Sequence, residues 1–157
     1  MQPSNLAIIT GGEMECIDWT LLAIAKAGST PLQPVQLQKA LFLIGQNLSK
    51  AKLKARFYIF DAYDYGPFCQ AVYGDAETLE QTGLVTITRP PQSRYKLYTA
   101  TEAGHERARA LEQQLDADAV DYVGKAVRYT QSLSFNDLVA AIYKAYPEMK
   151  VNSVFKA

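Results

Sequence analysis

Apolar positions in the first third of the chain repeat with the period of an α-helix. Ile17, Leu21 and Ile24 form one stripe within residues 13–27, and Gly28 follows as a stop signal. Pro34 suits the first turn of a second helix, whose stripe consists of Leu37, Leu41, Ile44 and Leu48. We expect this second helix to run into a basic end, formed by Lys50, Lys52, Lys54 and Arg56.

The middle of the chain changes from an aromatic segment to a third helical pattern. Residues 57–65 predict a short strand or an extended link. Gly66 and Pro67 then interrupt the chain, and Pro67 fits the first position of a helix that ends at Gly83. Its predicted apolar face contains Phe68, Val72, Ala76 and Leu79.

Two short alternating runs follow, at 85–89 and 94–99, and the Pro-Pro-Gln-Ser segment between them predicts a hairpin tip. Thr101 leads into further helices, the last of which starts at Ser134 and stops at Pro147. Three helices and then a hairpin is the order of a winged helix-turn-helix. The predicted fold is therefore mainly α (α+β): a winged helix-turn-helix with a two-stranded wing and extra C-terminal helices. We expect a flexible lead at 1–12 and one domain over 13–157.

Composition narrows the environment and the partners. The 157 residues carry 16 lysines and arginines against 16 acids, so the formal net charge is zero. That balance gives no overall attraction to nucleic acid or to an anionic membrane. No run approaches the roughly 20 apolar residues of a membrane span, and the first ten residues lack a secretory signal. Cys16 and Cys69 form neither a disulfide framework nor a metal-binding pair. We expect a cytoplasmic protein.

Candidates for catalysis are few. His105 is the only histidine, and the sequence contains no phosphate-binding loop, dinucleotide turn or nucleophile elbow. Asp61 and Asp64 could divide acid and base roles, or they could bind the turn backbone and cap the next helix. Cys69 is the one candidate reactive thiol, because a nearby helix N-terminus stabilises a thiolate. We expect no enzyme, no cofactor and no metal site.

Charge and tyrosine content favour a protein partner over DNA. Residues 57–88 contain no lysine or arginine but five acids, which are Asp61, Asp64, Asp75, Glu77 and Glu80. Such a helix would repel phosphates, whereas DNA-reading helices carry basic and amide side chains. The chain also has ten tyrosines, a residue enriched at protein interfaces. DNA binding remains the alternative through basic residues outside this region: Arg89, Arg94 and Lys96 of the hairpin, and Lys50, Lys52, Lys54 and Arg56.

Several motifs together resemble a known family. Residues 37–43 (LQKALFL) and 63–68 (YDYGPF) are similar to the "LQKLLYF…YGPFS" pattern of the YwgA-like and SocA-like antitoxin (Panacea) group of bacterial and phage proteins. Residues 98–104 are similar to its wing exit, and the segment from Leu138 to Ser153 to its "YVYxxYPE…S" ending. The likeness spans 37–153, with Cys69 where the pattern has serine and Tyr98 where it has leucine.

The resemblance implies a non-enzymatic domain that acts through protein contact, as an antitoxin or a proteolysis adaptor. The partner would be a toxin or a protease or chaperone system. The expected contact residues are Tyr63, Asp64, Tyr65, Gly66, Pro67 and Phe68 with the acidic Asp75, Glu77 and Glu80. The sequence leaves open the identity of the partner and the oligomeric state, a homodimer included.

Overall fold

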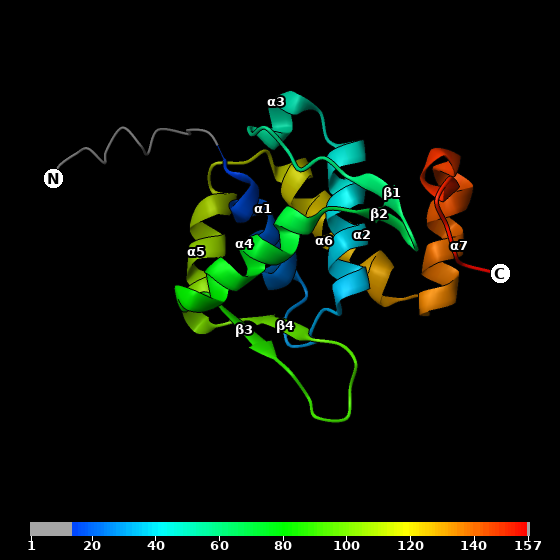
Figure 1. Cartoon of the computed structure of the whole chain (residues 1–157). Helices are drawn as coiled ribbons and strands as arrows, with labels where there is room; N and C mark the ends of the chain where they lie inside the picture. Colours follow the sequence, from blue (N-terminus) through cyan, green and yellow to red (C-terminus); the bar gives the residue numbers. More distant parts are fainter. Residues whose placement is uncertain (1–13, 157) are drawn as a thin grey trace, which may run out of the picture.

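A computed structural model of the chain describes residues 14–156 (Figure 1). The predicted lead at 1–12 lies outside this range. Seven α-helices occur within it, which are α1 (Cys16–Lys26), α2 (Pro34–Asn47), α3 (Lys50–Leu53), α4 (Gln70–Gln81), α5 (Glu102–Glu112), α6 (Ala117–Gln131) and α7 (Phe135–Ala145). Two antiparallel hairpins pair β1 (Asp61–Tyr63) with β2 (Gly66–Phe68) and β3 (Val85–Thr88) with β4 (Leu97–Ala100). A 3₁₀-helix, η2 (Pro147–Lys150), follows α7. The expected mainly helical α+β class is confirmed.

The first helix contains the whole predicted stripe but is shorter than the predicted range of 13–27. It begins at Cys16, where the Asp18 carboxylate accepts a hydrogen bond from the Glu15 backbone N–H at 3.0 Å. A side chain that satisfies a free N–H of the first turn defines where a helix begins. The helix ends at Lys26, and Gly28 follows with a φ of +65°, which is the predicted stop.

The second helix does not continue into the basic segment, so that expectation was wrong. It begins at Pro34 as predicted but ends at Asn47, because Leu48 adopts an extended backbone. The Ser49 side chain then accepts a hydrogen bond from the Lys52 backbone N–H at 3.3 Å and begins α3. The lysines therefore occupy a separate single turn of helix.

The largest correction concerns Pro67, which does not begin the third helix. It lies in β2, opposite Ala62 of β1, and Phe68 belongs to the same strand. Helix α4 starts later, with Cys69 as its N-cap. The Gln38 side chain donates to the Cys69 carbonyl and accepts from the Cys69 N–H, both at 2.9 Å. These two bonds satisfy the Cys69 backbone from another helix and keep the preceding residues extended.

The second hairpin agrees with its prediction. Gly83 ends the preceding turn with a φ of +82°, which favours glycine, and β3 pairs with β4 from Val85 opposite Ala100 onward. Leu32 and Tyr98 exchange backbone hydrogen bonds of 2.9 Å in both directions. The hairpin is thereby joined to the segment between α1 and α2.

Helices α5 and α7 begin at the predicted residues. Thr101 accepts from the Gly104 N–H at 3.0 Å, and Ser134 from the Asp137 N–H at 3.1 Å. Helix α7 stops before Pro147, as expected. In Figure 1 the β1–β2 hairpin lies between α4 and α7, while α3 and the β3–β4 hairpin lie at opposite ends of the molecule. No helix of the described part is long and apolar enough to cross a membrane.

Candidate functional site

A groove of about 360 Å³ runs beside the β1–β2 hairpin, and we call it the hairpin groove. Five parts of the chain line it. The lining residues are Pro34, Val35, Gln38 and Lys39 of α2; Tyr63, Asp64, Tyr65, Gly66 and Phe68 of the hairpin; Tyr73 of α4; Tyr95 of the 89–96 loop; and Phe135 of α7. Five of the six contact residues predicted in 63–68 therefore meet at one concave surface, and Pro67 lies buried beside them.

The hairpin is held from the C-terminal side by the segment after η2. The Asp64 carbonyl accepts a hydrogen bond from the Val154 N–H at 3.0 Å and one from the Ser153 hydroxyl at 3.4 Å. The Asn152 side chain donates to the Ala62 carbonyl at 3.1 Å. These bonds fix the outer side of the hairpin, although the two strands are only three residues long.

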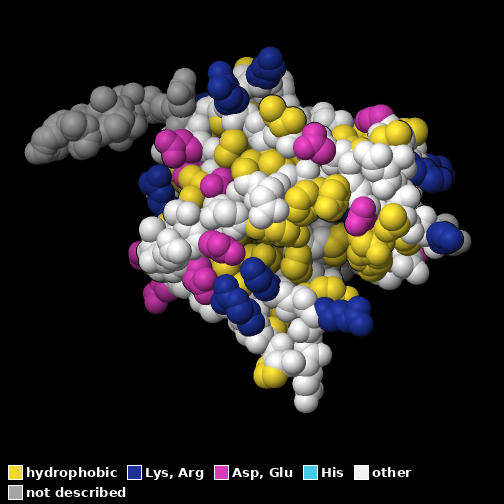
Figure 2. All heavy atoms as spheres, in the orientation of Figure 1, with side chains coloured by type: hydrophobic (Ala, Val, Ile, Leu, Met, Phe, Trp, Pro, Cys, Tyr) yellow, Lys and Arg dark blue, Asp and Glu magenta, His cyan; other side chains and the backbone are white. Residues whose placement is uncertain are grey.

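The walls of the groove are aromatic. Tyr63 stacks on Phe68 with ring centroids 5.2 Å apart, and Tyr65 meets Phe135 edge-to-face at 5.2 Å. Tyr63 is nevertheless 55% exposed and Tyr65 45% exposed. Figure 2 shows hydrophobic side chains gathered over this part of the surface, with mixed charges near the β3–β4 hairpin. Large rigid rings with polar tips that face solvent are typical of protein interfaces.

Lys39 lies at the base of the groove and has an unusual environment. The residue is 4% exposed, and its ammonium donates to the Pro67 carbonyl at 3.3 Å. No carboxylate of the described residues lies within 4.0 Å of that ammonium. Burial disfavours the charged form and lowers the pKa of Lys39 to about 8.

Asp75, one of the predicted acidic contact residues, is part of an internal network. Its carboxylate accepts a hydrogen bond from the Tyr58 hydroxyl at 2.5 Å, and that hydroxyl lies 2.7 Å from the Thr20 hydroxyl. Burial, followed by the bond to Asp75, raises the pKa of Tyr58. Asp75 therefore joins α4 to the core and is not a free surface charge.

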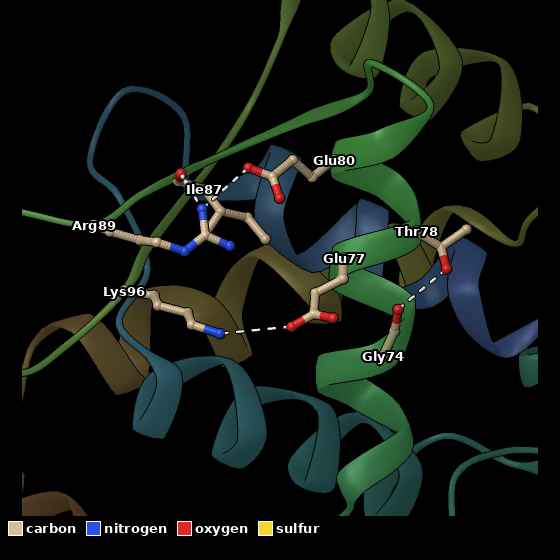
Figure 3. Close-up of polar contacts among 7 residues, drawn as sticks. All are labelled: Gly74, Glu77, Thr78, Glu80, Ile87, Arg89 and Lys96. Carbon is tan, nitrogen blue, oxygen red and sulfur yellow. Dashed lines mark hydrogen bonds and ion pairs between the residues drawn. The ribbon is translucent and has the colours of Figure 1, made fainter.

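Glu77 and Glu80, the other two acids, contact the two ends of the 89–96 loop between β3 and β4 (Figure 3). Glu77 lies 3.6 Å from the Lys96 ammonium, and Glu80 lies 3.4 Å from the Arg89 guanidinium. The structure thus brings together two groups of residues that the sequence assigned to different partners. Their charges offset one another, so neither forms a strong patch of one sign.

The remaining basic candidates do not join the hairpin cations. Lys52 pairs with Asp118, and the Lys54 ammonium donates to the Gln114 carbonyl at 2.7 Å. With Lys50 and Arg56 they lie around α3, at the far end of the molecule from the 89–96 loop that carries Arg94 (Figure 1). The seven basic candidates therefore do not form one continuous surface.

The candidate nucleophiles and acids are dispersed. Cys69 is partly buried at the N-cap of α4, with its backbone held by Gln38. Asp61 lies in β1 and Asp64 in the turn, and neither caps α4. His105 lies on α5. Within residues 14–156, no group of three or more His, Cys, Asp or Glu side chains could hold a metal ion.

The sequence analysis missed the groove residues outside the hairpin, which are Lys39, Tyr73, Tyr95 and Phe135 among others. One local signal could have indicated Lys39. Residues 40–44 are apolar on every side of the helix, a pattern of a fully buried helix, so the adjacent lysine was a candidate buried charge.

No protein-family model matches the sequence, and no curated protein or solved structure matches it.

Proposed function

We propose that this chain is a non-enzymatic protein-interaction module, antitoxin-like or adaptor-like, that binds its partner through the hairpin groove. One observation carries the proposal. Of the five exposed aromatic side chains among the described residues, four line this groove: Tyr63, Tyr65, Tyr95 and Phe135. Clustered exposed apolar surface of this kind marks interaction sites.

The position of the family-like motifs supports the antitoxin-like assignment. Three of the four segments that resemble the YwgA-like and SocA-like group are far apart in sequence, at 37–43, 63–68 and 138–153. They meet at the β1–β2 hairpin, because Lys39 bonds to Pro67 while Ser153 and Tyr143 contact the Asp64 carbonyl at 3.4 and 3.5 Å. A shared contact region gives the three motifs one physical reason to occur together.

We also infer a winged-helix arrangement, with α1, α2 and α4 as the three helices and β3–β4 as the wing. The wing follows α4 directly and pairs with Leu32 between the first two helices. A cytoplasmic site of action in a bacterial or phage-infected cell fits the two free thiols, Cys16 and Cys69, because reducing compartments keep cysteines unpaired.

The test is affinity capture with a matched pair of variants. The tagged full chain would be used to capture partners from a bacterial lysate, and both the bound proteins and the 260/280 nm absorbance ratio would be measured. We expect one partner in stoichiometric amount with little nucleic acid. Replacing Tyr63 and Tyr65 by serine should abolish capture, because the exposed walls of the groove are lost.

Tyr129→Ser is the control, since Tyr129 is also 45% exposed but lies on α6, away from the hairpin groove. This variant should retain the partner. If the Tyr63/Tyr65 double variant is folded by circular dichroism and still binds fully, the groove is not the contact surface. If Tyr129→Ser alone loses the partner, the interface lies on α6.

A DNA-binding transcriptional regulator is the second candidate. It would use Arg89, Arg94 and Lys96 of the wing, with Lys50, Lys52, Lys54 and Arg56. The ion pairs of Arg89 and Lys96 with α4 and the separation of the two basic groups weaken this alternative. Abundant captured DNA that dissociates at moderate salt, without a protein partner, would favour it.

A further inference from the structure

The ammonium group of Lys39 is a buried cation whose hydrogen-bonding capacity is largely unused. A lysine ammonium has three donors, and here one is directed to the Pro67 carbonyl. No other acceptor from residues 14–156 bonds to it, and no carboxylate pairs with it. Buried charges in proteins are normally paired, so this one lacks the counter-charge that its 4% exposure would require.

The Lys39 side chain borders a groove that a ligand can enter. The ammonium lies beside Gly66, because a Cβ built at Gly66 would be in ordinary van der Waals contact with the Lys39 nitrogen, at 3.7 Å. Lys39 also lines the hairpin groove. Asp64 is the only acidic lining residue, its side chain is exposed at the turn, and it does not pair with Lys39. The groove is thus an apolar, aromatic channel with one unneutralised cation at its base.

We propose that the hairpin groove binds an extended segment of the partner protein that places an aspartate or glutamate side chain against the Lys39 ammonium, with aromatic or aliphatic neighbours packed on Tyr63 and Tyr65. The inference rests on the proposed protein-binding function and specifies the chemistry of the segment. A carboxylate accepts two or more hydrogen bonds and matches one lysine. A nucleic-acid backbone fits less well, since phosphates favour clusters of cations, whereas this groove has one cation and an acid at its rim.

The occupant can be identified by peptide selection on the purified full chain. Short random peptides would be displayed on phage between fixed glycine-serine flanks, so that neither terminus is free. The same library would be selected on the wild type and on Lys39→Met, which keeps the length of the side chain but removes its charge. We expect wild-type peptides to contain an acidic residue beside an aromatic or aliphatic one. Lys39→Met should keep the apolar preference and lose the acidic one.

Matched peptides then measure the interaction directly. A selected peptide and its Glu→Gln or Asp→Asn twin would be titrated by calorimetry against the wild type, Lys39→Met and Asp64→Asn. A charge-assisted hydrogen bond in a buried site predicts about ten-fold or greater weakening for the amide twin on the wild type. Lys39→Met should bind both twins equally. Asp64→Asn should bind the acidic peptide several-fold more tightly, because a repelling charge is gone.

The outcomes separate this inference from the proposed function. Acidic enrichment that is equal on the wild type and Lys39→Met, or absent from both, overturns the role of Lys39 even if a protein partner is captured from the lysate. Failure to select any peptide, together with failure to capture a partner, overturns both proposals.

Discussion

At the scale of single residues, Lys39 shows how burial links charge to stability. An ordinary lysine has a pKa near 10.5, and burial lowers the pKa of this one to about 8. The protonated form is therefore disfavoured in the folded state by about 3 kcal/mol, from about 1.4 kcal/mol for each pH unit between the two values. Below pH 8 both the folded and unfolded chains carry the proton, and the full cost of burial is present.

We predict that this cost is relieved as the pH rises from about 8 to 10.5, the window in which the unfolded chain alone holds the proton. Relative to Lys39→Met, the wild type should gain up to about 3 kcal/mol of unfolding free energy across this window. Urea unfolding of both proteins at a series of pH values measures the difference. The other titratable groups that line the groove, which are Asp64, Tyr63, Tyr65, Tyr73 and Tyr95, are present in both proteins, so their contributions cancel. A difference that stays constant would show that Lys39 is solvated.

The candidate site was only partly predictable from the sequence. The exposure of Tyr63, Asp64 and Tyr65 was predictable, because a polar and aromatic turn before Gly66 must face solvent. The role of Lys39 was not, because it depends on a hairpin about 30 residues later that covers its side chain. Asp75 misled for a similar reason: its partner, Tyr58, lies on another segment. Local charge does not reveal long-range pairing.

At the scale of elements, helix starts and stops were predictable where one side chain or glycine controls them. Ser134, Thr101, Gly28 and Gly83 all act as their local chemistry predicts. The short strand expected within 57–65 is present as β1, but its pairing with β2 was not predictable, because three-residue strands have too few positions to alternate. Pro67 suits both a helix start and a short strand, and the distant Gln38 side chain decides between them.

A hairpin so short depends on the segment after η2 that binds its outer side. We predict that replacing both Asn152 and Ser153 by alanine loosens the hairpin selectively, because the bonds to the Ala62 and Asp64 carbonyls are lost. Each such bond contributes about 1 kcal/mol, so amide hydrogen exchange in 61–68 should accelerate by about ten-fold or more. Thr78→Ala is the control, since it removes one exposed bond within α4. Uniform acceleration throughout the protein would instead indicate global destabilisation.

At the scale of the whole molecule, the arrangement of charge favours binding of protein over DNA. The net charge is zero, and the cations around α3 lie far from the β3–β4 hairpin (Figure 1). Two of the three hairpin cations, Lys96 and Arg89, are offset by Glu77 and Glu80 (Figure 3). What remains distinctive is the aromatic groove on the side of α7. A molecule that binds DNA without specific contacts needs several cations that reach phosphates together, and this surface does not present them.

We predict that removing the acids that pair with the hairpin cations increases the affinity of the protein for duplex DNA. Replacing Glu77 and Glu80 by glutamine frees Lys96 and Arg89, and it should cost little stability because the pairs are exposed and each contributes about 1 kcal/mol or less. Binding to a random DNA duplex would be measured by fluorescence anisotropy. At about 50 mM salt the wild type should bind weakly and the variant several-fold more tightly. This gain in affinity should disappear near about 200 mM salt, because it arises from phosphate contacts. Tight wild-type binding with a steep salt dependence would contradict the offset of charges and make the wing a DNA-contacting element. If the variant binds the duplex no more tightly than the wild type, the ion pairs with Glu77 and Glu80 are not what prevents Lys96 and Arg89 from contacting DNA. The argument for a protein partner would then have to stand without these two ion pairs.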